Sequence, residues 1–150
     1  RTKQRRIVSL DKYREIEQFV EMSDTLTPKF GELGQVSFTV TDIDRAVVFL
    51  RDKVGLSFLF QVGPGGLAFF MLGSVRLMVT KPEGKATAGA NSTLYFKVPD
   101  IEASVAELTA RGVVFDDEPH LIAKMPDHEL WMAFFRDPDG SLLGLMCEKR

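Results

Sequence analysis

Apolar and polar residues alternate in residues 35–40 and again in residues 93–98. A period of two is typical of a strand that buries one face. Each segment leads to an aspartate, Asp42 or Asp100, which is followed by apolar residues at helical spacing. An aspartate in this place accepts hydrogen bonds from the first helical turn. The pattern therefore predicts a strand followed by a capped helix at both places.

Each predicted helix ends at a glycine, Gly55 or Gly112, which suits the left-handed residue that closes many helices. Short apolar segments separated by turn residues follow each glycine, and they are typical of hairpin strands. Three more strands are therefore predicted in each half of the chain. Their residues are 57–62, 67–72 and 75–80 in the first half, and 121–124, 130–136 and 141–148 in the second.

The two halves also resemble each other residue by residue. FTVTDIDRAVVFL, residues 38–50, and FKVPDIEASVAEL, residues 96–108, are identical at six of thirteen positions, where unrelated segments would share about one. The chain is thus predicted to contain a βαβββ unit twice, in residues 34–81 and 92–148, within a domain spanning residues 33–150. Residues 1–32 are expected to be an N-terminal extension with an amphipathic helix over residues 10–22.

Composition narrows the classes of function. The chain has 150 residues with 19 basic and 21 acidic side chains, a net charge of −2, which argues against a nucleic-acid partner. One cysteine excludes a framework of internal disulfides. Apolar runs are too short for a membrane span or signal peptide. We therefore expect a cytoplasmic protein with no membrane partner.

The closing segment FFRDPDGSLLGLM, together with VTDIDRAVVFL and VPDIEASVAEL, resembles the vicinal oxygen chelate superfamily. Its members include glyoxalase I, extradiol dioxygenases, methylmalonyl-CoA epimerase and the bleomycin and fosfomycin resistance proteins. The likeness covers residues 34–148. It implies an α+β fold in which eight strands form a cup-shaped incomplete β-barrel with the helices outside. It also implies that the cup is the binding site and that the protein is a homodimer.

Metal-dependent members of that superfamily carry His or Glu ligands at four inward positions of the strands. The resemblance assigns these positions to Gln35, Met78, Thr93 and Gly144. Divalent metal ions favour imidazole and carboxylate ligands over an amide, a thioether or a hydroxyl group. We therefore expect no metal at the usual position of the family, and no other cofactor.

Strand alternation predicts which other side chains line the cup if Gln35 and Thr93 point inward. Arg76 and Lys97 are then inward, and no inward acid is identified. This lining suits a small organic molecule with an anionic group, although both long side chains could instead extend into water. The opposite face is apolar, and Cys147 on it is expected to be an unreactive core thiol. The candidate ligand-binding residues are Gln35, Ser37, Thr39, Arg76, Met78, Thr93, Tyr95, Lys97, His120, His128 and Gly144.

The two histidines leave a second function open. His120 and His128 lie eight residues apart, in EPHLIAKMPDHELW, with carboxylates close in sequence. They are either hydrogen-bonded surface residues or relocated metal and acid–base groups. The first function is a metal-free small-molecule binding protein similar to the bleomycin-resistance branch. The alternative is a metal-dependent lyase, isomerase or dioxygenase that uses His120 and His128. Trp131 is either a pocket wall or part of the core.

Overall fold

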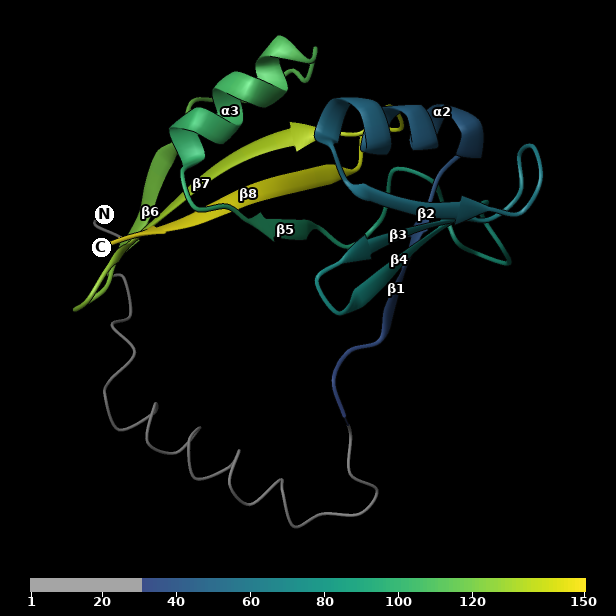
Figure 1. The fold of residues 1–150 in the computed structure, drawn as a ribbon, viewed down its shortest axis with the longest axis horizontal. Coiled ribbons are helices and arrows are strands. Elements are labelled where there is room, and N and C mark those ends of the chain that lie inside the picture. The colour runs from purple at the N-terminus through teal and green to yellow at the C-terminus, as the bar shows by residue number, and fades with distance from the viewer. Residues whose placement is uncertain (1–30) are drawn as a thin grey trace, which may run out of the picture. The chain divides into compact units, whose positions relative to one another are not determined.

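The computed structural model describes residues 31–150, in which Leu33–Arg150 form one unit. The helix expected over residues 10–22 lies outside the described residues. The unit contains two four-stranded sheets, with strand orders β1-β4-β3-β2 and β5-β8-β7-β6. Within each repeat the strand order is first, fourth, third, second. The doubled βαβββ unit is therefore confirmed (Figure 1).

The first repeat begins with a strand and a capped helix, as predicted. The Asp42 side chain accepts a hydrogen bond from the Arg45 backbone N–H at 3.0 Å, and Gly55 has a φ of 84°. The predicted single helix is, however, an α-helix followed by a π-helix, in which the neighbouring Phe49 and Leu50 are both buried. A π turn holds more residues than an α turn, so it can turn two adjacent side chains toward the core. The elements are β1 (Gln35–Thr39), α2 (Ile43–Val48), η1 (Phe49–Val54), β2 (Ser57–Gln61), β3 (Ala68–Leu72) and β4 (Val75–Thr80).

The second repeat has the same plan. Asp100 caps its helix by accepting from the Ala103 N–H at 2.9 Å, and Gly112 has a φ of 89°. In each repeat the first strand pairs in parallel with the last, and the second strand carries a register shift. The elements are β5 (Leu94–Lys97), α3 (Ile101–Ala110), β6 (His120–Lys124), β7 (Glu129–Arg136) and β8 (Leu142–Lys149).

Each sheet has one face covered by a helix and one open face. Figure 1 shows α2 and α3 on the same side of the two sheets, so both open faces lie on the other side. Both sheets are open, and the described strands form no closed barrel. Residues 31–150 contain no helix with the length and apolar character needed to cross a membrane. The core beneath the helices includes Phe38, Val40, Phe70, Leu77, Val79, Phe135, Leu143, Leu145 and Cys147.

Candidate functional site

The open face of the first sheet contains the polar residues that alternation assigned to it. In the parallel pair of β1 and β4, Gln35 lies opposite Arg76 and Ser37 lies opposite Met78. Thr39 lies opposite Thr80 at the end of the same pair. The residues between them, such as Phe38 and Leu77, are buried. The open face therefore carries small polar groups, thioethers, one guanidinium and the Phe69 ring, which lies opposite Met78 in the pair of β3 and β4.

The open face of the second sheet also carries aromatic rings. Tyr95 lies opposite Gly144 and Lys97 lies opposite Met146 in the pair of β5 and β8. Phe134 lies opposite Gly144 on its other side, and its ring meets the Tyr95 ring edge-on. Thr93 directly precedes β5.

The four positions of the family metal site do not present a set of metal ligands. The Gln35 amide nitrogen donates to the Met78 sulfur at 3.6 Å, so these two side chains are engaged with each other. Gly144 has no side chain, and a Cβ added there would lie 3.0 Å from Tyr95 Cδ1 and 3.1 Å from Phe134 Cε1. No group of three or more His, Cys, Asp or Glu residues suited to a metal ion occurs within residues 31–150. These donors do not fit a divalent ion.

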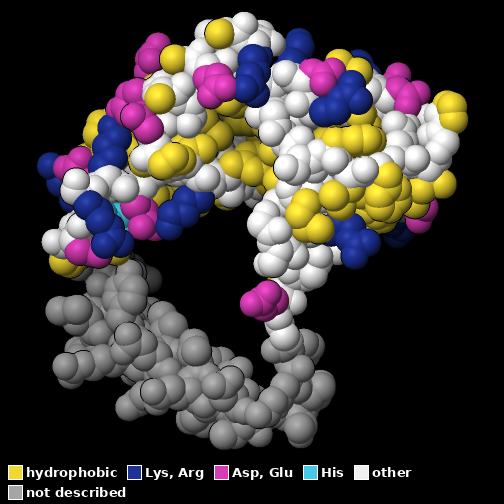
Figure 2. Space-filling model, in the orientation of Figure 1, with side chains coloured by type: hydrophobic (Ala, Val, Ile, Leu, Met, Phe, Trp, Pro, Cys, Tyr) yellow, Lys and Arg dark blue, Asp and Glu magenta, His cyan; other side chains and the backbone are white. Residues whose placement is uncertain are grey.

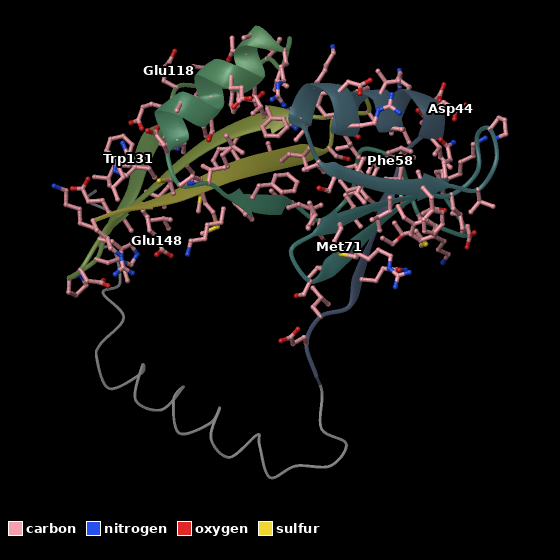
Figure 3. The ribbon with its side chains drawn as sticks, viewed as in Figure 1. Asp44, Phe58, Met71, Glu118, Trp131 and Glu148 are labelled. Carbon is pink, nitrogen blue, oxygen red and sulfur yellow. The ribbon has the colours of Figure 1, made fainter. Side chains whose placement is uncertain are left out.

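The two cations on the open faces have different surroundings. Lys97 Nζ lies 3.2 Å from the Glu148 carboxylate, so the expectation of no inward acid is wrong. Figure 3 shows Glu148 on the side of the second sheet away from α3. Glu148 is four residues beyond Gly144 in β8, so the alternation that places Gly144 inward predicts the same face for Glu148. Arg76 has no ion-pair partner among residues 31–150, and its guanidinium lies 6.0 Å from the Phe69 ring centre.

The structure does not bring the two histidines together. His120 begins β6, where its Nδ1 lies 3.0 Å from the Glu118 carbonyl oxygen and 3.3 Å from an Asp117 carboxylate oxygen. His128 lies beyond the other end of β6, in the turn to β7. Its Nδ1 donates to the Asp127 carboxylate at 2.8 Å, a hydrogen bond that lowers the pKa of Asp127. Both histidines thus have local hydrogen-bond partners of their own.

Trp131 and Cys147 lie on the face that packs toward α3. They are opposite each other in the pair of β7 and β8, and Cys147 is 2% exposed. This confirms the expected core position of the thiol. Trp131 packs against the core, its indole N–H donates to Glu129 at 3.0 Å, and Lys149 Nζ lies 4.1 Å from its ring centre. Trp131 is therefore on the core side of the sheet.

A cleft of about 550 Å³ lies between the repeats. The sequence did not predict it, because alternation places Val36, Leu94 and Phe96 on the helix-covered face, whereas they are only partly buried. Tyr95 and Lys97 are the two candidate residues that border this cleft. Its lining is Val36, Leu56, Leu72, Gly73, Val75, Leu94, Tyr95, Phe96 and Lys97. A second cavity of about 510 Å³, between α3 and residues 112–118, contains none of the candidate residues.

Side chains also join the two repeats, and no pattern in the sequence predicted these contacts. Asn91 accepts from the Thr39 backbone N–H and donates to the Thr39 carbonyl oxygen and to Ser141 Oγ, each at 2.8 Å. Asp139 accepts from the Thr41 backbone N–H at 2.9 Å and lies 3.0 Å from the Arg45 guanidinium. Asn91 lies in the connection between the repeats, and Asp139 lies in the turn before β8. These two residues hold the end of β1 against the second repeat.

Comparisons with known proteins agree with this fold. The family model of the Glyoxalase/Bleomycin resistance protein/Dioxygenase superfamily matches residues 32–145. The uncharacterized protein YraH of Bacillus subtilis (strain 168) is 27% identical over 127 residues, which cover 75% of this chain and 94% of YraH.

Two solved structures from Streptomyces sp. CB03234 are also similar. TnmS3, an antibiotic binding protein, has a TM-score of 0.67 and 23% identity, covering 80% of this chain and 98% of TnmS3. A glyoxalase/bleomycin resistance protein has a TM-score of 0.61 and 26% identity, covering 76% of this chain and 98% of its own.

Proposed function

Because the chain belongs to the glyoxalase/bleomycin resistance protein/dioxygenase superfamily, we propose that it binds a small organic anion without a metal at the usual family position. The observation that carries this proposal is that the usual metal position holds no suitable ligands. The Gln35 amide is hydrogen-bonded to the Met78 sulfur, and two aromatic rings border the space beside Gly144. TnmS3, whose fold this chain shares, is described as an antibiotic binding protein, which is consistent with small-molecule binding on this scaffold.

Arg76 is the residue we assign to the anionic group. Its guanidinium is exposed on the open face of the first sheet and has no ion-pair partner among residues 31–150. A guanidinium forms two parallel hydrogen bonds with a carboxylate, which gives a directional contact. Lys97 is less suited because Glu148 already neutralises it at 3.2 Å. Arg76 follows Val75 in β4; Val75 lines the cleft, and Arg76 lies on the neighbouring open face.

The test compares binding of a carboxylate with binding of its neutral carboxamide, by titration calorimetry of the chelator-treated protein. We expect Arg76→Ala to weaken carboxylate binding about tenfold, the effect of losing one charge-assisted contact of about 1.5 kcal/mol. Lys53→Ala, which removes an exposed cation in the last turn of η1, is the control and should change carboxylate binding little. Addition of zinc, manganese or nickel should leave both affinities unchanged. Carboxylate binding that requires the metal, or that ignores Arg76→Ala, contradicts the proposal.

The alternative of relocated metal ligands has less support. It needs His120 and His128 in one site, but His120 begins β6, His128 lies beyond the other end of that strand, and each has a local partner. The metal additions in the same calorimetric experiment also test this alternative, because it requires binding or turnover to depend on the ion.

We also propose that the protein is a homodimer. An exposed apolar surface, here called the β2–β3 patch, is consistent with an interface, because exposed apolar groups in a cluster favour protein contacts. Figure 2 shows apolar side chains gathered over β2, β3 and β4. The patch consists of Leu59, Phe60, Val62 and Leu67.

A further inference from the structure

Gly144 allows two aromatic rings to sit directly over the backbone of β8. A Cβ there would lie 3.0 Å from Tyr95 Cδ1 and 3.1 Å from Phe134 Cε1, closer than ordinary carbon contacts. The two rings therefore occupy the space that any larger residue would need for its side chain. The place where the resemblance expects a metal ligand is thus covered by aromatic carbon.

Neighbouring side chains hold the Tyr95 ring in place while leaving much of it exposed. Its centre lies 6.1 Å from that of Phe134 with an interplanar angle of 80°, a favourable edge-to-face geometry. The Phe134 ring in turn lies 6.1 Å from the His120 ring. Tyr95 is nevertheless 50% exposed. An aromatic side chain with few rotatable bonds loses little entropy on contact, so an exposed and supported ring is a good binding surface.

The surroundings of Tyr95 have room for a ligand and suit an apolar one. Tyr95 borders the cleft of about 550 Å³, which is within the range of small-molecule sites. Most other lining residues, among them Leu72, Val75 and Leu94, are aliphatic. Of the lining side chains, Lys97 alone is charged, and Glu148 balances it.

We propose that Tyr95 stacks against an aromatic ring of the ligand, so that the ligand class is an aromatic acid. This inference rests on the proposed function for the acidic group and adds the ring. The supporting geometry is independent of Arg76, because it involves β5, β7 and β8 rather than the first sheet. The two contributions can therefore be separated by mutation.

The experiment uses three probes on the full chain: naphthalene carboxylate, its saturated counterpart decalin carboxylate, and naphthalene carboxamide. Affinities are measured by calorimetry, and contact is checked by shifts of the Tyr95 and Phe134 ring protons in NMR spectra. Tyr95→Leu should weaken both naphthalene probes about three- to tenfold and leave decalin carboxylate within about twofold. Tyr95→Phe keeps the ring and should bind like the unmodified protein.

Arg76→Ala gives the opposite pattern, with both carboxylates weakened and the carboxamide unchanged. If only that pattern appears, the proposed function holds and the aromatic subsite is wrong. If only the Tyr95→Leu pattern appears, the ring contact holds and the assignment of Arg76 is wrong. The inference is also overturned if neither naphthalene probe binds at millimolar concentration, or if Tyr95→Leu weakens decalin carboxylate as much as naphthalene carboxylate.

Discussion

Replacing Asn91 with alanine tests whether side chains set the junction between the two repeats. The Asn91 amide makes three hydrogen bonds of 2.8 Å, two to the backbone of Thr39 and one to Ser141 Oγ, all partly buried. A buried or partly buried hydrogen bond contributes about 0.5–1.5 kcal/mol net, and an abandoned partner adds to the cost. We therefore expect Asn91→Ala to lower the free energy of unfolding by about 2–4 kcal/mol.

The assay is urea unfolding followed by the fluorescence of Trp131, the one tryptophan of the chain. The matched control is Gln61→Ala, which removes a single exposed amide hydrogen bond to Asp44 and should cost about 0.5 kcal/mol or less. A loss for Asn91→Ala no larger than that of the control would refute the reasoning. A biphasic transition in Asn91→Ala alone would support it further, since it would indicate that the repeats no longer unfold together.

Two further predictions concern pH and assembly. Burial raises the pKa of Asp137, so its contribution to stability is present below the unfolded-state pKa of about 3.9 and is lost as pH rises through the folded-state pKa. Asp137→Asn keeps an acceptor for the Ser141 N–H and should make the free energy of unfolding fall less steeply with rising pH. The free energy is measured by urea unfolding at several pH values, and a pH dependence equal to that of the unmodified protein contradicts this. For the homodimer, light scattering should give twice the chain mass, and Phe60→Glu within the β2–β3 patch should give a monomer. A single-chain mass for the unmodified protein contradicts that expectation.

The fold could be predicted from the sequence because each repeat has strong local signals. Asp42 and Asp100 cap the two helices, and Gly55 and Gly112 close them with positive φ. Alternation then gave the face of each strand, since one face is apolar and a shift by one residue would expose it. The π-helical end was not predictable, because the apolar spacing fits an ordinary helix.

The site was predicted less completely, because its shape depends on contacts between the repeats. Alternation placed Gln35 and Tyr95 on the open faces but cannot show that the partly buried Val36 and Phe96 border a cleft. Asn91 lies in a connection with no periodic pattern, so nothing near it in sequence indicated its partners. Glu148, by contrast, follows from the alternation of β8 itself, because it lies four residues beyond Gly144 on the same face.

The two sheets share no backbone ladder in the described part of the chain, and the end of β1 meets the second repeat through Asn91 and Asp139. The two sheets are therefore held together by side-chain contacts, in the shared core and at Asn91 and Asp139, whereas each sheet is held by its own backbone ladder. We expect a substitution of Asn91 or Asp139 to change the spacing of the two sheets, and with it the width of the cleft, without replacing a residue that lines the cleft. Duplication thus gives the scaffold a way to accept molecules of new size while both of its halves stay intact.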